Sequence, residues 1–373
     1  MPIRNALRGP VKAARGRRRT SPGVSGAWNF SRLAALFQGQ FSWQLHGGER
    51  LRRAQRIRSA KLGLMDAAAS PDRTRKRPGT GRRLRADQAL LGAHMSIAGG
   101  KQLAVRRAVD AGCKVLQIFV KNSNQWSAPE LQEEEVHAFR TERKKARLRA
   151  VVAHSSYLIN LASPQEPLWK RSVSAMLDEL RRSERLQLSH LVTHPGAHVG
   201  SGESAGIRRV AEAIDRIHEE CNADFPRIAL ETTAGQGTSL GHRFEHLRDI
   251  VSACRNPERV DLCVDTCHVF AAGYDVRSGE SCRQVFEELD RIVGLQKLAL
   301  FHFNDSKKPL GSRVDRHEHI GKGAIGSEGF EWILNERRFS KIPKILETPK
   351  GENLEYDIEN LRLLRSLIQE AED

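Results

Sequence analysis

The 373-residue sequence contains six short apolar segments that each end in a residue able to bind a metal ion. The six end residues are three histidines and three carboxylates: His154, His194, Glu231, Asp265, His302 and Glu347. One histidine at such a place means little, but six metal-ligating residues in succession are hard to obtain by accident. Burying three carboxylates together without cations would cost several kcal/mol for each charge. Bound metal is therefore the natural explanation of the pattern.

Two further groups of such residues lie just beyond the apolar segments. His268 follows Asp265 by three residues, and Asp315 and His317 form an Asp-x-His pair in a loop bounded by glycines. Structural zinc takes four ligands and catalytic zinc takes three and a water, so nine ligands with one shared carboxylate would serve three ions. The five imidazoles favour zinc, or manganese or iron, over magnesium or calcium. Ions about 3.5–4 Å apart are typical of enzymes that act on phosphoesters.

The elements that position these residues repeat along the chain from Leu90 onward. Eight short runs of apolar, often β-branched residues predict strands at 90–94, 115–120, 150–154, 191–194, 228–231, 262–265, 298–302 and 345–347. Continuous apolar runs suit strands that are buried on both faces of a parallel sheet. Between the runs, an amphipathic spacing of apolar residues predicts helices, among them 170–186, 207–220, 243–254 and 281–293.

Eight such units in about 280 residues match the size and the number of units of an α/β fold, the (β/α)8 TIM barrel. A doubly wound open sheet is the alternative that the pattern leaves open. In a barrel, the carboxyl ends of the strands meet on one rim, where barrel enzymes carry their active sites. The barrel therefore predicts that the nine candidate ligands converge on the C-terminal rim.

Positive charge is concentrated in the first 87 residues. This segment contains 21 lysines and arginines but four acidic residues, whereas the other 286 residues contain 40 basic and 41 acidic side chains. We predict a basic, disordered extension over residues 1–87 and a barrel domain over residues 88–373. Three interpretations of the extension stay open: an organellar transit peptide, a nucleic-acid-binding tail, or residues upstream of a true start at Met65.

The composition also indicates where the protein works. No stretch approaches 18 consecutive apolar residues, which excludes a transmembrane helix and predicts no membrane partner. The six cysteines include no Cys-x-x-Cys pair, which indicates free thiols in a reducing compartment. We expect an intracellular protein, cytoplasmic in a bacterium and nuclear or mitochondrial in a eukaryote.

Several motifs resemble endonuclease IV, the family of zinc-dependent apurinic/apyrimidinic endonucleases. The motifs are HSSYLIN at 154–160, THPG at 193–196, ETTAGQG at 231–237, VDTCH at 264–268, HFNDSK at 302–307 and DRH at 315–317. The resemblance covers essentially all of residues 90–370 in collinear order, and the N-terminal extension has no counterpart in compact members. It implies a TIM-barrel DNA repair enzyme that cuts the DNA backbone 5′ to an abasic site. The products would be a 3′-hydroxyl and a 5′-deoxyribose phosphate, and the enzyme would also trim blocked 3′ ends.

The resemblance also implies a trinuclear zinc centre, in which manganese or iron can replace zinc. By this resemblance the ligands of the first ion are His154, His194 and Glu231. The second ion shares Glu231 and adds Asp265, His302 and Glu347, and the third is held by His268, Asp315 and His317. Glu231 and Glu347 are the expected catalytic carboxylates, and Glu347 helps to orient the attacking water, whose pKa the metals lower. The expected partner is double-stranded DNA containing abasic sites, and we expect a monomer without an obligate protein partner.

The loops of the rim are expected to recognise the lesion. Tyr157 and Leu158, just beyond His154, resemble the family element that enters the DNA at the flipped-out abasic nucleotide. Extrusion costs least where a base is missing, which supplies selectivity.

Two other loops are expected to contact the DNA. Arg313 and Arg316 are predicted to bind phosphates. Residues 121–126 match a second loop of the family with one departure. Asn124 stands where well-studied members carry an arginine that inserts into the base stack.

Two other functions remain compatible with the residues. A xylose-isomerase-like sugar isomerase or epimerase also uses a barrel with Glu, Asp and His ligands. It needs one or two metal ions, however, and leaves His268, Asp315 and His317 unexplained. A catalytically silent DNA-binding module gains little support from a chain that retains nine ligand-type residues.

Overall fold

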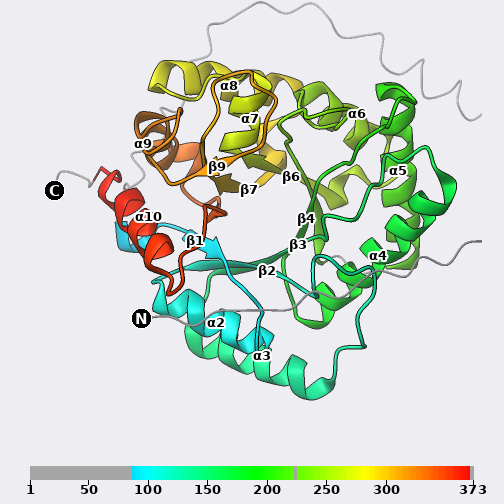
Figure 1. Cartoon of the computed structure of the whole chain (residues 1–373), viewed down its shortest axis with the longest axis horizontal. Helices are drawn as coiled ribbons and strands as arrows, with labels where there is room; N and C mark the ends of the chain where they lie inside the picture. The colour runs from blue at the N-terminus through cyan, green and yellow to red at the C-terminus, as the bar shows by residue number, and fades with distance from the viewer. Residues whose placement is uncertain (1–85, 222–224, 370–373) are drawn as a thin grey trace, which may run out of the picture. The chain divides into compact units, whose positions relative to one another are not determined.

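The computed structural model describes residues 86–221 and 225–369, in which eight parallel strands close into a barrel (Figure 1). The barrel strands are β1 (Leu91–His94), β2 (Val115–Phe119), β3 (Ala150–His154), β4 (His190–Thr193), β5 (Arg227–Glu231), β6 (Val260–Asp265), β7 (Leu298–Phe303) and β10 (Lys344–Leu346). Neighbouring strands follow chain order, and β1 closes the barrel by pairing with both β2 and β10. The closed barrel confirms the predicted fold and excludes the open sheet. All eight predicted strands are present, with ends that differ by at most two residues.

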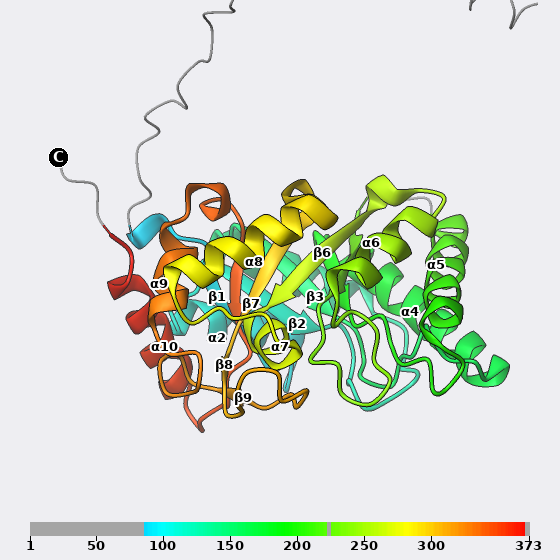
Figure 2. The same ribbon diagram turned by 90° about the horizontal axis from the view of Figure 1, so that it is seen from above.

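Helices surround the barrel on its outside (Figures 1 and 2). They are α2 (Lys101–Asp110), α3 (Glu133–Ala146), α4 (Glu166–Arg185), α5 (Glu203–Glu220), α6 (Phe244–Ala253), α8 (Gly279–Ile292), α9 (Glu328–Asn335) and α10 (Glu355–Ser366). Helix α4 begins before its predicted start at Lys170, because Pro167 suits the first turn of a helix. A backbone N–H, which proline lacks, has no partner there in any case. The short helix α7 (Thr266–Ala272) directly follows β6.

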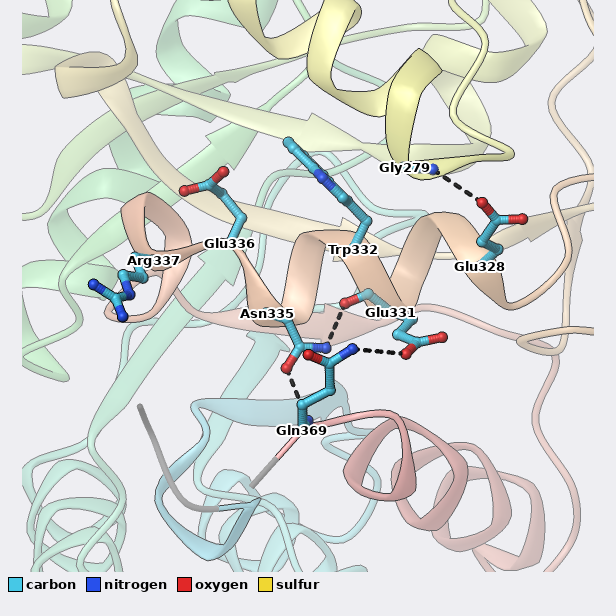
Figure 3. A pocket seen from close by; sticks show the side chains of 8 residues that line it. All are labelled: Gly279, Glu328, Glu331, Trp332, Asn335, Glu336, Arg337 and Gln369. Carbon is cyan, nitrogen blue, oxygen red and sulfur yellow. Dashed lines mark hydrogen bonds between the residues drawn. The ribbon is translucent and has the colours of Figure 1, made fainter. Parts of the chain in front are cut away.

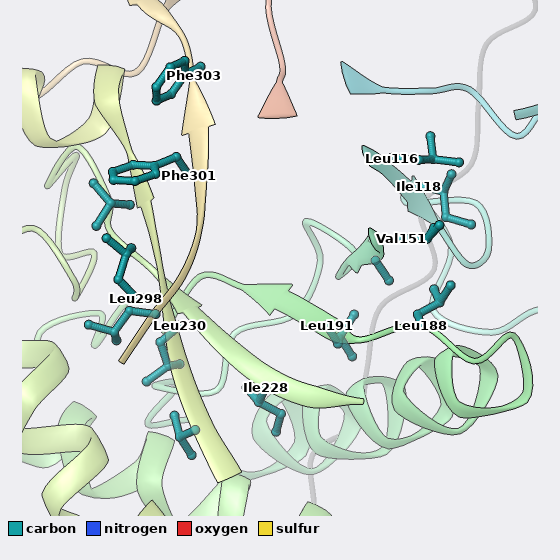
Figure 4. Close-up of a cluster of buried hydrophobic side chains, with 14 of the residues drawn as sticks. Leu116, Ile118, Val151, Leu188, Leu191, Ile228, Leu230, Leu298, Phe301 and Phe303 are labelled. Carbon is teal, nitrogen blue, oxygen red and sulfur yellow. The ribbon is translucent and has the colours of Figure 1, made fainter. Parts of the chain in front are cut away.

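Two layers of apolar side chains hold the barrel and the helices together. The outer layer points from the strands toward the helices and includes Leu116, Val151, Ile228 and Phe301 (Figure 4). The inner layer fills the barrel with one buried residue from each of seven strands: Val115, Val152, Val192, Ala229, Cys263, Leu300 and Ile345. Successive residues of each strand alternate between the two layers, because side chains along a strand point to opposite faces.

The eighth strand, β1, contributes no side chain to the inner layer. Its inward position is Gly92, where a Cβ atom would lie 1.8 Å from the backbone oxygen of Val115 on β2. Glycine is therefore required for these two strands to approach each other. Because the alternation continues along every strand, the residue two positions after each inner position also points into the barrel. These residues lie at or near the carboxyl ends of the strands.

Two predictions concern the edges of the described chain and its relation to membranes. The predicted extension, residues 1–87, lies outside the described residues except for Ala86 and Asp87, which begin a short 3-10 helix (Ala86–Gln88). Among the helices of residues 86–221 and 225–369, none combines the length and the apolar character needed to cross a bilayer.

Candidate metal centre

Each strand contributes one residue, at or near its carboxyl end, to a ring of eight polar side chains on one rim of the barrel. In strand order, this strand-end ring consists of His94, Gln117, His154, His194, Glu231, Asp265, His302 and Glu347. Each member stands two residues after an inner position of its strand. Six members are the strand-end ligands that the sequence predicts, and His94 and Gln117 complete the ring. The barrel geometry thus brings the six predicted residues together.

Glu231 has imidazoles on both sides of its carboxylate. Its Oε2 atom is 3.1 Å from Nε2 of His154 and 3.1 Å from Nε2 of His194. Its Oε1 atom is 2.8 Å from Nδ1 of His302 and 3.3 Å from Nδ1 of His268. A carboxylate whose two oxygen atoms face different groups of ligands has the geometry to bridge two metal ions.

Asp265 and Glu347 lie next to His302. Nδ1 of His302 is 3.3 Å from Oε2 of Glu347 and 4.0 Å from Oδ2 of Asp265. Asp265 is also the N-cap of α7, since its Oδ1 atom accepts a 2.9 Å hydrogen bond from the backbone N–H of His268. This cap turns the chain directly after β6, and the first turn of α7 brings His268 back toward the ring.

The third group of predicted ligands combines the buried His268 with Asp315, whose side chain is 42% exposed, and His317, which is partly buried. Nε2 of His268 is 3.2 Å from Oδ2 of Asp315, and Nε2 of His317 is 3.1 Å from Oδ1 of the same carboxylate. The antiparallel strands β8 (Asp305–Ser306) and β9 (His317–Glu318) fold the segment after β7 back on itself. This short sheet includes His317 and has Asp315 two residues before it, in a segment that the sequence places in a long loop.

The hydrogen bonds of three histidines leave their Nε2 atoms facing carboxylates. His154, His268 and His317 donate from Nδ1 to the carbonyl oxygens of Ser155, Thr232 and Glu347, at 2.8, 2.9 and 3.1 Å. A neutral imidazole that donates from Nδ1 carries a lone pair on Nε2. A lone pair and a carboxylate oxygen 3.1–3.2 Å apart repel each other unless a proton or a metal ion lies between them. Imidazole nitrogens and carboxylate oxygens placed in this way suit ligands that hold a cation between them.

The charges of the site attract cations as well. Burial lowers the pKa of His268, but Asp265 and Asp315 outweigh burial and hold that pKa well above the ordinary imidazole value. The same carboxylates overcome burial and raise the pKa of His317 to about 9. The buried Nε2 atoms of both histidines make no hydrogen bond within the described residues. The donor set, the lone pairs and the charges fit divalent ions that imidazole and carboxylate bind, zinc above all.

Two buried amides, Gln117 of the ring and Asn304 beside it, hold the ligands in place. Oε1 of Gln117 accepts a 2.8 Å hydrogen bond from Nε2 of His302, and its Nε2 donates to Oε1 of Glu347 at 2.5 Å. Asn304 donates from Nδ2 to Oδ2 of Asp265 at 2.6 Å and accepts from the backbone N–H of Glu347 at 2.9 Å. Such contacts fix the orientation of a ligand and the tautomer of a histidine.

Sequence reasoning did not single out His94 and Gln117. Nδ1 of His94 lies 3.4 Å from Oε1 of Glu347, and Nε2 of Gln117 lies 3.0 Å from Nδ1 of His94. Both residues could have been predicted from the alternation of inward and outward side chains along the strands. They follow the inward positions Gly92 and Val115 by two residues, as the ligands do on the other strands.

Two neighbouring loops beside the ring carry residues that the sequence predicts to contact DNA. Tyr157, in the loop after β3, is 68% exposed, and Leu158 beside it is partly buried. Asn124 is exposed in the loop after β2. The hydroxyl of Ser156 donates a hydrogen bond to the carbonyl oxygen of Ser123, so the two loops touch.

The two predicted arginines flank Asp315 in the segment between β8 and β9. Arg313 and Arg316 are both exposed, and Nη1 of Arg316 donates to the backbone oxygen of Asp315 at 2.6 Å. The nearby Glu318 lies 3.9 Å from Nζ of Lys307. Both guanidinium groups therefore lie at the surface of the rim, and their contact with phosphate stays a prediction.

A cavity of about 310 Å³ opens on the rim, and its lining includes His154, Tyr157, His194 and Asp315. A larger cavity of about 510 Å³ lies outside the barrel, between α8, α9 and Gln369 (Figure 3). Its lining contains none of the candidate ligands. Two of its carboxylates already bind within the protein, Glu328 to the backbone N–H of Gly279 and Glu331 to the amide of Gln369. The chemistry therefore belongs to the smaller cavity.

Known proteins resemble this chain in sequence and in structure. Residues 105–367 match the family described as xylose isomerase-like TIM barrel. A Chloroflexus aurantiacus protein named probable endonuclease 4 is 53% identical over 281 residues, which cover 75% of this chain and 99% of that protein. The crystal structure of endonuclease IV from Thermus thermophilus has a TM-score of 0.67 and 37% identity, over 75% of this chain and 99% of that one.

A second group of solved structures is related more distantly. A D-tagatose 3-epimerase-like protein has a TM-score of 0.58 at 19% identity, over 74% of this chain and 96% of that one. This likeness shows a shared fold alone. Sequence identity is therefore much higher to the proteins named endonuclease 4 or endonuclease IV than to the epimerase-like protein.

Proposed function

The chain belongs to the endonuclease IV family, and from this premise we propose that it cuts duplex DNA 5′ to abasic sites. The proposed products are a 3′-hydroxyl and a 5′-deoxyribose phosphate, and the same site would trim blocked 3′ ends. Membership makes the protein a metal-dependent nuclease of DNA repair. The observation that carries the finer proposal is the set of histidine nitrogens and carboxylate oxygens that face each other at 3.1–3.2 Å.

Three zinc ions are the proposed cofactor, and manganese or iron could replace them. The proposed ligands of the three ions are His154, His194 and Glu231, then Glu231, Asp265, His302 and Glu347, and finally His268, Asp315 and His317. The position of Glu231, with one oxygen atom toward each of two imidazole groups, supports its role as the shared ligand. Bound zinc supplies a water ligand with a pKa near 7 and neutralises the negative charge that develops on phosphate oxygens.

Glu347 is the proposed positioning group for the attacking water. Its side chain is 16% exposed, whereas those of Glu231 and Asp265 are fully buried, so Glu347 is the ring carboxylate that is most open to a substrate. Gln117 donates to Oε1 of Glu347, and the amide of Asn304 accepts from its backbone N–H. These contacts fix the carboxylate in one orientation, as in-line attack on phosphorus requires.

The rim loops are the proposed contacts with DNA. Tyr157 is exposed and aromatic, which suits stacking against bases at the gap left by a flipped abasic nucleotide. Leu158 would support this wedge, and the exposed Arg313 and Arg316 would bind phosphates. Asn124 lies in the neighbouring loop but is too short and uncharged to stack and bind phosphate as arginine does.

Residues 88–373 are the proposed catalytic domain, acting as a monomer on DNA inside the cell. In the Chloroflexus relative, 99% of the length matches 281 residues of this chain. That relative therefore consists of little more than a domain of the size proposed here. The basic segment 1–87 would then add non-specific attraction to DNA that weakens with salt.

An incision assay tests the proposed function. We expect the purified protein to cut an end-labelled duplex at a single abasic-site analogue, to leave the undamaged duplex intact, and to lose activity with chelator. The label should report cleavage on the 5′ side with a 3′-hydroxyl end, and added zinc should restore it. Intact lesion DNA together with metal-dependent conversion of a ketohexose would favour the sugar epimerase instead.

A further inference from the structure

A buried ion pair lies beneath the two loops that carry Asn124 and Tyr157. Nζ of Lys121 is 2.6 Å from Oε1 of Glu179, and the two side chains are 2% and 1% exposed. Lys121 lies just after β2, and Glu179 belongs to α4, on the outside of the barrel (Figure 1). Burying two charges requires a desolvation free energy that an apolar contact of similar size avoids. The pair therefore calls for a role other than stability.

The lysine shapes the first loop. Besides its contact with Glu179, Nζ of Lys121 donates a 2.9 Å hydrogen bond to the carbonyl oxygen of Gln125. The backbone N–H of Gln125 in turn donates to the carbonyl oxygen of Asn122 at 3.1 Å. The ammonium group thus closes a turn that has Asn124 on its exposed side.

The glutamate holds the second loop. Oε2 of Glu179 accepts a 3.0 Å hydrogen bond from the backbone N–H of Ser156, the residue before Tyr157. The hydroxyl of Ser156 accepts from the backbone N–H of Leu158 at 3.3 Å and donates to the first loop at Ser123. One ion pair and one hydroxyl therefore connect the backbones of both loops.

Helix α4 extends this support along the first loop. Nη2 of Arg182 donates to the carbonyl oxygens of Ala128 and Pro129 at 3.0 and 2.8 Å. The guanidinium of Arg171 lies 4.5 Å from the centre of the Trp126 ring. The first loop is thus bound to α4 at three places, and Glu179 is the one that also binds the second loop.

We propose that Lys121 and Glu179 are positioning residues that fix the Asn124 loop and the Tyr157 loop relative to each other. The inference rests on the proposed function, because it assigns these loops to lesion recognition. Loops that are already ordered lose less conformational entropy when they bind. The pair would therefore strengthen the binding of abasic DNA without touching the reacting atoms.

Double variants separate positioning from folding. Lys121→Met/Glu179→Leu removes both charges together, and replacing a buried pair with apolar side chains of similar volume often leaves stability unchanged. Lys121→Met/Glu179→Gln keeps an amide oxygen that can accept from Ser156. The matched control is Lys101→Met/Glu135→Gln, which removes a Lys–Glu pair of 3.5 Å between α2 and α3.

We expect the Met/Leu variant to raise KM for an abasic-site duplex by about tenfold, with kcat and zinc content within twofold of wild type. The amides of Ser156 and Leu158 should exchange hydrogen faster than in wild type, in the absence of DNA. The Met/Gln variant should recover part of the affinity, and the control variant should behave as wild type.

Three results would overturn the proposal: an unchanged KM, unchanged exchange at Ser156 and Leu158, or a fall in kcat as large as the rise in KM. The exchange measurement needs neither DNA nor activity. If wild-type protein fails to cut abasic DNA, the proposed function fails, whereas exchange still reports whether the pair orders the loops.

Discussion

The strand-end ring and the two loops beside it are held in place by different means. The barrel backbone positions the ring, because a strand that slipped by one residue would turn its whole inner set outward. Glu231, Asp265 and His302 are fully buried there. Tyr157, in contrast, is 68% exposed, and its loop depends on side-chain hydrogen bonds such as that from Ser156 to Glu179.

Properties that depend on the loops can therefore vary more easily than properties that depend on the ring. A ring residue belongs to a barrel strand or its end, faces the other candidate ligands and contacts the amide of Gln117 or Asn304 in several cases. A substitution there therefore disturbs the strand packing, the ligand set and these hydrogen bonds together. A loop position such as Asn124 can change while the ring keeps its geometry. We therefore expect changes in the ring to remove the chemistry and changes in the loops to adjust affinity.

The largest effect is expected from Glu347→Gln in the ring. The amide cannot act as a carboxylate ligand or orient water in the same way, so incision should fall by about 10²–10³-fold or more. Binding of abasic DNA should stay largely intact, because the loss concerns the transition state more than the bound substrate. Single-turnover cleavage and a binding titration separate the two. Equal losses in rate and affinity would contradict the assigned role.

Gln117→Leu tests whether the amide of the ring acts together with the metal ligands. Leucine cannot accept from His302 or donate to Glu347, so zinc affinity should fall by about 10–100-fold. A competitive titration with a zinc-binding dye measures this directly. Gln296→Leu is the matched control, since this glutamine is exposed before the amino end of β7. Equal zinc affinity in Gln117→Leu and wild type would separate Gln117 from the metal site.

Tyr157→Ala tests the loops in the same way. Loss of one base–aromatic stack costs about 1–3 kcal/mol, so the Kd for abasic DNA should rise by about tenfold. The number of zinc ions and the rate at saturating DNA should stay as in wild type. Tyr356→Ala on α10 is the matched control for loss of an exposed tyrosine. If Tyr157→Ala binds like wild type, the loop after β3 is not the wedge.

The smallest expected effect is on thermal stability as a function of pH. In metal-free protein, the raised pKa values of His268 and His317 make their protonated forms stabilising. For His317 this contribution is complete below about pH 6.5 and is lost as the pH rises through about 9. The Tm of metal-free protein should therefore fall by a few degrees over this range. Zinc-loaded protein should not show the fall, because zinc binds the deprotonated ligands, and parallel curves would contradict the account.

Six of the eight ring residues could be predicted from the sequence, because buried parallel strands leave a simple signal. Each apolar run ends where the barrel ends, so a polar residue at that point is conspicuous. His268 was also predictable, since it follows a strand-end carboxylate by one helical turn. Gln117 was not, because a neutral amide inside an apolar run carries no charge that requires a partner.

The loops show what the sequence could not supply by periodicity. Tyr157 and Asn124 are assigned through resemblance, and Arg313 and Arg316 through their charge. The structure places all four at the rim without testing their contacts. The Lys121–Glu179 pair joins a residue just after β2 to one in α4, and an ion pair between distant elements leaves no pattern in a single sequence. Such contacts depend on the tertiary fold.

The central claim is that six residues of the strand-end ring, together with His268, Asp315 and His317, form a trinuclear zinc centre. Elemental analysis of active protein, purified without chelator, tests this claim most directly. Nine ligands in groups of three, four and three, with Glu231 shared, predict about three zinc ions per chain. A reproducible value of one or fewer in a preparation that cuts abasic DNA at full rate would contradict it.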